Sequence, residues 1–395
     1  MPLEGRHVAV VGAGIGGIAA ALLLARGGAR VTLFERDPEP RTVRAGLLLQ
    51  PNGLAVLYGL DLDERLQRRG ARVSQLRVAD AAGATLFDVP IPRFAAGLDH
   101  ALVLRRREVL AALVDLVVAE PGVERRFGTE VDAVTADGSV AFRTPKGPAT
   151  LRADLVVGAD GVHSRVRKAS RVDARVSHGF RYVRGLGPPM RLDGMTEYWT
   201  SLGIFGLAPV DHGTYFYGAA DAQPLATAIE EQDVELFRRA WAAALPAAGE
   251  ALAGVRRFQD LLVNEVRRVD CARWVDGAVV LLGDAAHAMA PNLGQGAGSA
   301  LVDAVVLAWE LAQPGEPAAA LARYERRRRP AVRAVQDLTD RLAWLASVHH
   351  PALRGVRDAA VRLLGSWVVG EVPLRLVEQE DPLWLRLTAT APAAA

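Results

Sequence analysis

Three features of the sequence predict an α/β protein with two kinds of sheet. A strand, a glycine-rich turn and a helix follow one another near the N-terminus, as in a Rossmann-like dinucleotide-binding domain. The middle of the chain alternates apolar and polar residues, as a half-buried antiparallel sheet does. Beyond residue 297 the apolar spacing is helical. We therefore expect a Rossmann-like domain, an inserted and mostly antiparallel β-sheet domain, and C-terminal helices.

Residues 6–36 form the first unit, in which a predicted strand leads through a glycine turn to a helix and a second strand. Gly12, Gly14 and Gly17 have the G-x-G-x-x-G spacing. The first permits a tight turn, the second lets a pyrophosphate approach the backbone, and the third lets the helix pack on the strand. Glu35 ends the second strand, where a carboxylate can accept both ribose hydroxyls of an adenosine but would repel a 2′-phosphate. The unit predicts an ADP moiety and leaves NAD and FAD open.

The later elements follow from the same periodicities. They are a helix over 106–118, short strands over 130–134, 139–143 and 154–158, antiparallel strands over 180–186, 203–208 and 214–218, and helices between 297 and 364. Pro314, Pro330 and Pro351 are expected to separate the C-terminal helices. The run Arg326–Arg329 lies within that helical pattern and is expected to form a solvated face. The Ala/Pro-rich tail beyond Thr388 is expected to be disordered.

Composition argues against several functional classes. The 47 basic residues are balanced by 45 acidic ones, and a net charge of +2 argues against a nucleic-acid surface. No uninterrupted apolar run approaches the ~20 residues of a membrane span, and no signal peptide is recognisable. Cys271 is the only cysteine, so no intramolecular disulfide can form and a cytoplasmic location is expected. We also expect no metal site.

The stretch from Gly283 to Gly298 carries the strongest chemical signal. Asp284 follows an apolar strand, where a carboxylate can hold the hydroxyls of a ribose-like or ribityl chain. The glycines behind it, including Gly294 and Gly296, expose backbone N–H groups to an electron-rich ligand, and the following helix N-terminus adds to their effect. By themselves, the same residues also suit a plain strand-to-helix turn that needs glycine only for positive φ.

A further strand-to-turn motif over 154–167 contains Asp160 and Gly161, and a plain NAD dehydrogenase has no need of it. With the glycine turn before it and Asp284 after it, the chain resembles the class A flavoprotein monooxygenases. This family includes the p-hydroxybenzoate and salicylate hydroxylases and the tetracycline-inactivating monooxygenases. The resemblance covers residues 6–345. It implies a glutathione-reductase-type FAD-binding domain over 1–75, 102–174 and 268–345, a substrate-binding domain over 76–101 and 175–267, and a C-terminal helical segment and tail over 346–395.

The resemblance also implies which residues bind a tight, non-covalent FAD. They are Gly12, Gly14, Ile15, Gly16, Gly17, Glu35, Arg36, Arg44, Arg106, Val131, Asp160, Asp284, Gly294, Gly296 and Ala297. Arg106 matches the helix-starting arginine near the flavin, with Arg105 and Arg107 as alternative registers. The backbone of Pro291 and Gly294 would form the catalytic wall beside flavin C4a. His287 is expected to order its loop, with a catalytic base as the alternative.

The implied activity is that of an FAD-dependent, NAD(P)H-driven monooxygenase. A flavin C4a-hydroperoxide formed from O2 would hydroxylate or epoxidise an aromatic or polycyclic small molecule. The nicotinamide donor would bind only transiently, because the chain has no second G-x-G-x-x-G. The substrate would contact Tyr182, Arg184, Phe205 and Tyr217, although each also suits ordinary sheet packing. Their aromatic character favours an aromatic or polyketide-like ligand.

Several alternatives stay open at this level. A flavin-dependent dehydrogenase or reductase without oxygen insertion would share these motifs, and so would a non-catalytic flavin-binding protein. The motifs also leave open the substrate, the choice among hydroxylation, epoxidation and Baeyer–Villiger oxidation, the preference for NADH or NADPH, and whether the protein is a monomer or a homodimer.

Overall fold

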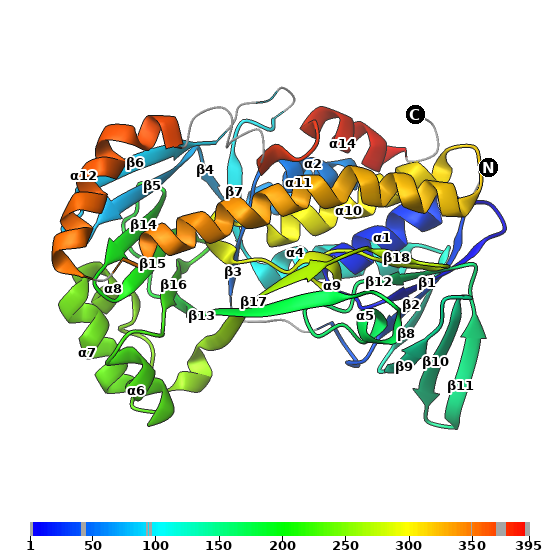
Figure 1. Ribbon diagram of the computed structural model, residues 1–395, viewed down its shortest axis with the longest axis horizontal. Coiled ribbons are helices and arrows are strands. Elements are labelled where there is room, and N and C mark those ends of the chain that lie inside the picture. The colour runs from blue at the N-terminus through cyan, green and yellow to red at the C-terminus, as the bar shows by residue number, and fades with distance from the viewer. Residues whose placement is uncertain are drawn as a thin grey trace.

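Figure 1 shows the computed structural model of the chain, which describes residues 3–40, 45–91, 94, 97–348, 350–368 and 377–391. A six-stranded sheet and a seven-stranded sheet lie at opposite ends of the molecule. The helices α10 (Gln295–Ala312) and α11 (Pro317–Ala346) cross above the sheets, and α11 runs along much of the long axis. The expected α/β architecture, with two kinds of sheet and C-terminal helices, is confirmed.

The six-stranded sheet forms the Rossmann-like part. Its strand order is β18-β19-β12-β1-β2-β8, and all its pairs are parallel except β18 with β19. The strands are β1 (His7–Val11), β2 (Arg30–Glu35), β8 (Val123–Phe127), β12 (Leu155–Gly158), β18 (Val275–Asp276) and β19 (Val279–Leu281). Helix α1 (Ile15–Arg26) follows β1 and packs against α10. Because the strands are parallel, the turns after β1, β12 and β19 emerge at one edge of the sheet.

The seven-stranded sheet has the order β17-β13-β16-β15-β14-β5-β6, and only β14 with β5 is parallel. Its strands are β5 (Gln75–Asp80), β6 (Thr85–Pro90), β13 (Ala174–Gly187), β14 (Met195–Thr200), β15 (Gly203–Val210), β16 (Gly213–Ala219) and β17 (Leu262–Cys271). One face packs on α6 (Leu225–Glu230), α7 (Val234–Ala244) and α8 (Pro246–Ala251). The other face lies toward the Rossmann-like part, and we call it the inner face.

Smaller elements complete the core. A sheet of β3 (Gly46–Leu49), β7 (Ala101–Arg105) and β4 (Ala71–Val73) lies between the two large sheets, and β9 (Val131–Val134), β10 (Ser139–Thr144) and β11 (Gly147–Arg152) form another. The remaining helices of the first half are α2 (Pro51–Gly59), α3 (Asp63–Arg69), α4 (Arg106–Ala119) and α5 (Arg165–Ala169). Helix α4 begins at Arg106, in agreement with the register preferred from the sequence.

The C-terminal helices differ from expectation at Pro330. This proline does not end a helix, because α11 continues through it from Pro317 to Ala346. An interior proline costs about 3 kcal/mol, and the buried contacts of α11 on both sides of it, including Tyr324 and Val332, offset that cost. Beyond it lie α12 (Pro351–Val368) and α14 (Pro382–Thr390), and α14 packs against α2.

Candidate active site

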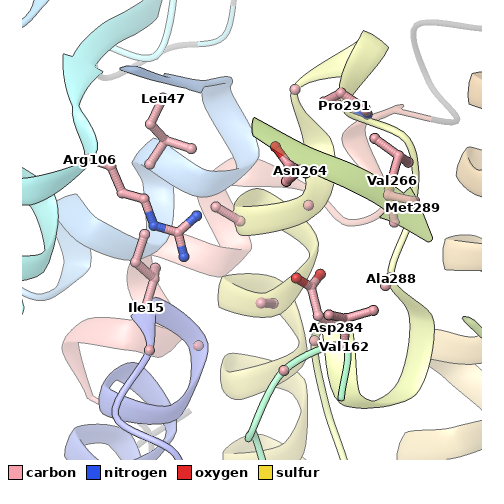
Figure 2. Close-up of a pocket in the computed structure, with 18 of the residues that line it drawn as sticks. Ile15, Leu47, Arg106, Val162, Asn264, Val266, Asp284, Ala288, Met289 and Pro291 are labelled. Atoms are coloured by element: carbon pink, nitrogen blue, oxygen red, sulfur yellow. The ribbon is translucent and has the colours of Figure 1, made fainter. Parts of the chain in front are cut away.

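A pocket of about 310 Å³ lies between the Rossmann-like part and the inner face of the seven-stranded sheet. One wall consists of the turns after β1, β12 and β19 and the first turn of α10. The opposite wall consists of side chains from β13, β14, β16 and β17. Figure 2 shows Arg106 and Asp284 pointing into this space from opposite sides. We call it the central pocket.

The first glycine turn is folded as the sequence argument requires. Gly12 has φ 106° and lies against the Ala159 carbonyl, so an added Cβ would collide with that oxygen. A Cβ on Gly17 would collide with the carbonyl of Gly12. A Cβ on Gly14 would meet nothing within 4 Å, and Gly14 lines the pocket. Two glycines therefore serve close packing, whereas Gly14 keeps open space in front of the α1 N-terminus.

Some of the expected cofactor residues lie outside the lining of the central pocket, among them Glu35, Arg36 and Val131. Glu35 ends β2, and its carboxylate accepts the Ala13 N–H at 2.9 Å and the Asp37 N–H at 3.1 Å. Arg36 is mostly exposed, and Val131 is a buried residue of β9. These residues lie toward the β2 side of the glycine turn. Arg44 lies outside the described residues.

Asp160 points away from the central pocket. Its carboxylate accepts N–H groups of Arg165 (2.6 Å) and Val166 (3.1 Å) at the start of α5. Burial raises the pKa of Asp160, while these hydrogen bonds act in the opposite direction. The neighbouring Gly161 lines the pocket. Arg167 donates to the carbonyls of Val162 and Ala285, at 2.8 and 2.6 Å, and so joins this turn to the Asp284 turn.

Asp284 lies at the opposite side of the pocket from Arg106 (Figure 2). It is the first residue of the short helix α9 (Asp284–His287), after Gly283 with φ 59°. Among the described residues no ion pair within 4.0 Å involves Asp284, so its oxygens are available to a ligand. Burial lowers the pKa of Arg106, and the negative charge of Asp284 opposes that effect.

His287 faces away from the pocket into the core. Its Nε2 lies 2.5 Å from Oδ2 of Asp303, which also accepts the N–H of Gly283 at 3.0 Å. Arg328 donates to the other oxygen of Asp303 at 2.8 Å. Although burial acts to raise it, the charges of His287 and Arg328 hold the pKa of Asp303 down to about 2. This geometry favours a loop-ordering role for His287 over a catalytic base.

The glycine-rich segment before α10 closes the same wall. Pro291, Gly294, Gly296 and Ala297 all line the pocket. Gly294 has φ 64° and precedes the first helical residue, Gln295. A Cβ on Gly296 would meet nothing within 4 Å, as at Gly14. The glycine turn after β1, with Gly14, and the segment from Asp284 to Ala297 therefore border the same pocket.

The four expected substrate residues divide between the two faces of the sheet. Arg184 and Tyr217 line the pocket, and Tyr182 is buried beside them on the inner face. The expectation for Phe205 is wrong in its geometry, because this side chain lies on the outer face against Trp241, with ring centroids 4.7 Å apart. Phe205 pairs with Gly218, one residue after Tyr217, and successive strand residues face opposite sides.

Other pocket residues were not predicted from the sequence. Met195, Tyr215, Asn264 and Val266 lie on the inner face and line the pocket, and Leu47 of β3 borders it (Figure 2). Asn264 has a buried Oδ1 without a hydrogen-bond partner among the described residues. Side chains alternate between the two faces along β17, so Asn264 and Val266 share a face. Which face that is depends on the pairing of β17 with β13, which the sequence does not reveal.

No group of three or more His, Cys, Asp or Glu side chains in the described ranges is arranged to hold a metal ion. Within the same ranges, none of the helices combines the length and apolar character needed to cross a membrane.

Known proteins are similar to this chain in sequence and in fold. A family model described as "FAD binding domain" matches residues 6–339. A 2-heptyl-3-hydroxy-4(1H)-quinolone synthase of Mycobacteroides abscessus is 33% identical over 363 residues, covering 88% of this chain and 92% of that protein. A 3-amino-4-hydroxybenzoate 2-monooxygenase of Streptomyces cremeus is 34% identical over 359 residues, with coverages of 85% and 86%. The solved structure of 2-methyl-3-hydroxypyridine-5-carboxylic acid oxygenase has 26% identity and a TM-score of 0.75, covering 96% of this chain and 97% of that one.

Proposed function

This chain belongs to the FAD-binding domain family and is an FAD-dependent monooxygenase of the class A aromatic-hydroxylase type; on that premise we propose that it oxygenates an aromatic small molecule in the central pocket. The observation that carries the proposal is the arrangement of the pocket itself. An Arg- and Tyr-bearing sheet face, with Arg184 and Tyr217, lies opposite the glycine-rich wall of Pro291 and Gly294.

The residues present fit FAD. Gly14 and Gly296 each leave empty space where a side chain would project, which suits a pyrophosphate and a flavin ring held against backbone N–H groups. The available carboxylate of Asp284 suits the ribityl hydroxyls, and Arg106 supplies positive charge from the opposite side of the pocket. Glu35 suits the adenosine ribose, and we assign Arg36, the next residue, and Val131 to the same end of the cofactor. FAD, reduced by NAD(P)H, supplies the activation of O2.

The protein residues then have three tasks: to seat the substrate ring, to exclude water and to hold charge. Tyr215 and Tyr217 lie side by side, with ring centroids 5.9 Å apart and ring planes at 36°, and offer two aromatic faces to a substrate ring. Arg184 provides a cation on the same face. The quinolone and hydroxybenzoate relatives act on nitrogen- or oxygen-substituted aromatics, which supports the same substrate class here. A polyketide-like substrate is the alternative, and hydroxylation is the favoured outcome.

The remaining assignments complete the proposal. Residues 76–101 and 175–267, which contain most of β5, β6 and β13–β17, form the substrate-binding domain, and residues 1–75, 102–174 and 268–345 form the cofactor domain. The nicotinamide donor binds transiently. We place the protein in the cytoplasm, because its one cysteine, Cys271, is a free thiol. It acts as a monomer or a homodimer.

The decisive experiment combines donor consumption with oxygen labelling. FAD-loaded protein is screened with NADH and NADPH against hydroxylated and nitrogen-containing aromatics, and ligand-stimulated donor oxidation identifies the substrate. With labelled O2, one labelled oxygen atom is expected in the product for each donor oxidised. Ligand-stimulated donor oxidation without label in the product would instead indicate a reductase, and no oxidation with any ligand would indicate a flavin-binding protein without turnover.

A further inference from the structure

A buried carboxylate lies behind the central pocket and has no part in the chemistry described so far. Glu197 of β14 is 6% exposed, and no cation lies within ion-pair distance among the described residues. Its two oxygens have one partner each: Trp199 Nε1 donates to Oε1 at 2.9 Å, and the Tyr217 hydroxyl lies 2.7 Å from Oε2. An acid buried without a counter-ion is costly for stability, so a functional reason for it is worth testing.

Tyr217 reaches Glu197 across an intervening strand. Glu197 pairs with Gly206 of β15, and Gly206 pairs with Tyr217 of β16. A side chain at position 206 would collide with the Tyr217 ring. Because glycine stands there, the ring lies over β15 and brings its hydroxyl to the carboxylate. On its other side Tyr217 is directly opposite Arg184 of β13, and both line the pocket.

The single proton of the Tyr217 hydroxyl couples the pocket to Glu197. The Trp199 indole can only donate, so Oε1 of Glu197 is an acceptor in either protonation state. While Glu197 is ionised, Tyr217 donates to Oε2 and offers only lone pairs to a ligand. When Glu197 is protonated, the carboxyl donates to Tyr217, whose own proton then turns toward the pocket.

We propose that Tyr217 takes a proton from an acidic O–H or ring N–H of the aromatic substrate while its own proton passes to Glu197. This inference rests on the proposed function and narrows its substrate class to ionisable phenols and N–H heteroaromatics. The substrate O–H or N–H bond breaks as a new Tyr217 O–H bond forms, and the original Tyr217 O–H bond breaks as Glu197 is protonated. The negative charge moves from Glu197 to the substrate, and no electrons are transferred.

The surroundings support this proton transfer. Burial raises the pKa of Glu197, against the effect of its two hydrogen bonds, which makes the carboxylate a stronger proton acceptor. Burial also raises the pKa of Tyr182 and Tyr215, so both stay neutral beside it. Arg184 has a buried Nε without a hydrogen-bond partner among the described residues, and its charge stabilises the substrate anion.

One further cation faces this region from the helical side. The guanidinium of Arg357, on α12, lies 4.9 Å from the ring centre of Trp199, and Arg357 pairs with Asp358 at 2.7 Å. It therefore contacts the indole rather than the carboxylate. The ring of the substrate anion is more electron-rich than that of the neutral substrate. The anion is therefore the form that an electrophilic oxygen donor attacks.

The test uses 4-nitrophenol, which turns yellow on ionisation, with FAD-loaded protein and no nicotinamide donor. At a pH about one unit below the ligand's own pKa, binding is expected to produce the yellow anion while releasing about zero protons to solvent, because Glu197 keeps the proton. Difference absorbance measures the anion, and calorimetry in buffers of different ionisation enthalpy measures the proton release. Turnover plays no part, so a failed oxygenation assay leaves this result intact.

Two variants interrupt the transfer. With Glu197→Gln or Tyr217→Phe, bound ligand is expected either to stay neutral or to release about one proton for each anion formed. Tyr198→Phe is the matched control, because Tyr198 adjoins Glu197 on β14 but packs on the outer face, and it should behave like the parent. 4-Nitroanisole, which has no acidic proton, should bind the parent and Glu197→Gln equally. A parent that releases one proton per anion, forms no anion or fails to bind 4-nitrophenol saturably overturns the inference.

Discussion

Arg328 of α11 and Asp303 of α10 form an ion pair, with Nε 2.8 Å from Oδ1, in which neither side chain is exposed to solvent. The second oxygen of Asp303 holds His287 and the Gly283 N–H. The pair therefore lies directly behind the turn that carries Asp284. The expectation that Arg326–Arg329 forms a solvated face is wrong at Arg328, although Arg326 is exposed.

Arg328→Met should destabilise the protein strongly. Removing one partner of a buried ion pair leaves an uncompensated charge and typically costs about 3–5 kcal/mol. Arg326→Met, two residues earlier in the same run, should change stability by less than about 0.5 kcal/mol. Urea unfolding at neutral pH, followed by circular dichroism, measures both. Equal losses of unfolding free energy in the two variants would show that the buried ion pair adds no stability beyond that of an exposed arginine.

The same pair predicts a stability change in acid. The pKa of Asp303 is held at about 2, below the ordinary aspartate value of 3.8 expected in the unfolded chain. A depressed folded-state pKa means that the stabilisation is complete above about pH 4 and is lost as pH falls toward about 2. The difference in unfolding free energy between the parent and Asp303→Asn should therefore be constant from neutral pH to about pH 5 and shrink below about pH 4. A difference that shrank only on the alkaline side would contradict the assignment.

The parts of the site that could be predicted from the sequence depend on short-range geometry. Gly12 directly follows β1 and Gly17 lies in the first turn of α1, and backbone sterics select glycine at both positions. Asp284 lies three residues beyond the buried strand β19. Arg328 could not be placed in this way, because its partner Asp303 is on another helix. Its burial depends on how α10 and α11 pack.

The expected substrate residues show a second reason why part of the site could not be predicted from the sequence. Which face a strand residue occupies follows from strict alternation, but the choice of the inner face needs the register of neighbouring strands. Aromatic character alone groups Phe205 with Tyr217, although the pairing of Phe205 with Gly218 sets the two side chains on opposite faces of the sheet. In the sequence Gly206 gives no sign of a role. In the structure it leaves the space that the Tyr217 ring occupies.

Asp284→Ala should weaken FAD binding and leave the fold intact. A hydrogen bond from a ribityl hydroxyl to a carboxylate contributes about 1.5–3 kcal/mol, which corresponds to about a 10- to 100-fold rise in the FAD dissociation constant. Titration of the apo-protein, followed by flavin fluorescence, measures it. Asp115→Ala removes an exposed carboxylate from α4 and should leave the constant unchanged. An unaltered affinity in Asp284→Ala would remove this residue from the cofactor site.

The two ends of the cofactor should separate in a comparison of Glu35→Ala with Pro291→Ala. Glu35 lies at the end of β2 and also holds the Ala13 N–H, so its loss should raise the FAD dissociation constant by removing a charge-assisted contact and loosening the glycine turn. Pro291 lines the central pocket, where we propose that the substrate ring meets the flavin, and its truncation should leave FAD affinity nearly intact.

The coupling of NAD(P)H oxidation to product oxygenation should be affected by Pro291→Ala and not by Glu35→Ala. At saturating FAD, the share of NAD(P)H oxidation that yields oxygenated product instead of hydrogen peroxide should match the parent in Glu35→Ala, because the adenosine end is remote from the reacting ring. The same share should fall in Pro291→Ala, because a looser wall admits water beside the site of oxygen transfer. Peroxide and product are quantified in one reaction. If peroxide formation rose in Glu35→Ala and not in Pro291→Ala, the assignment of the two ends of FAD to these two residues would be wrong.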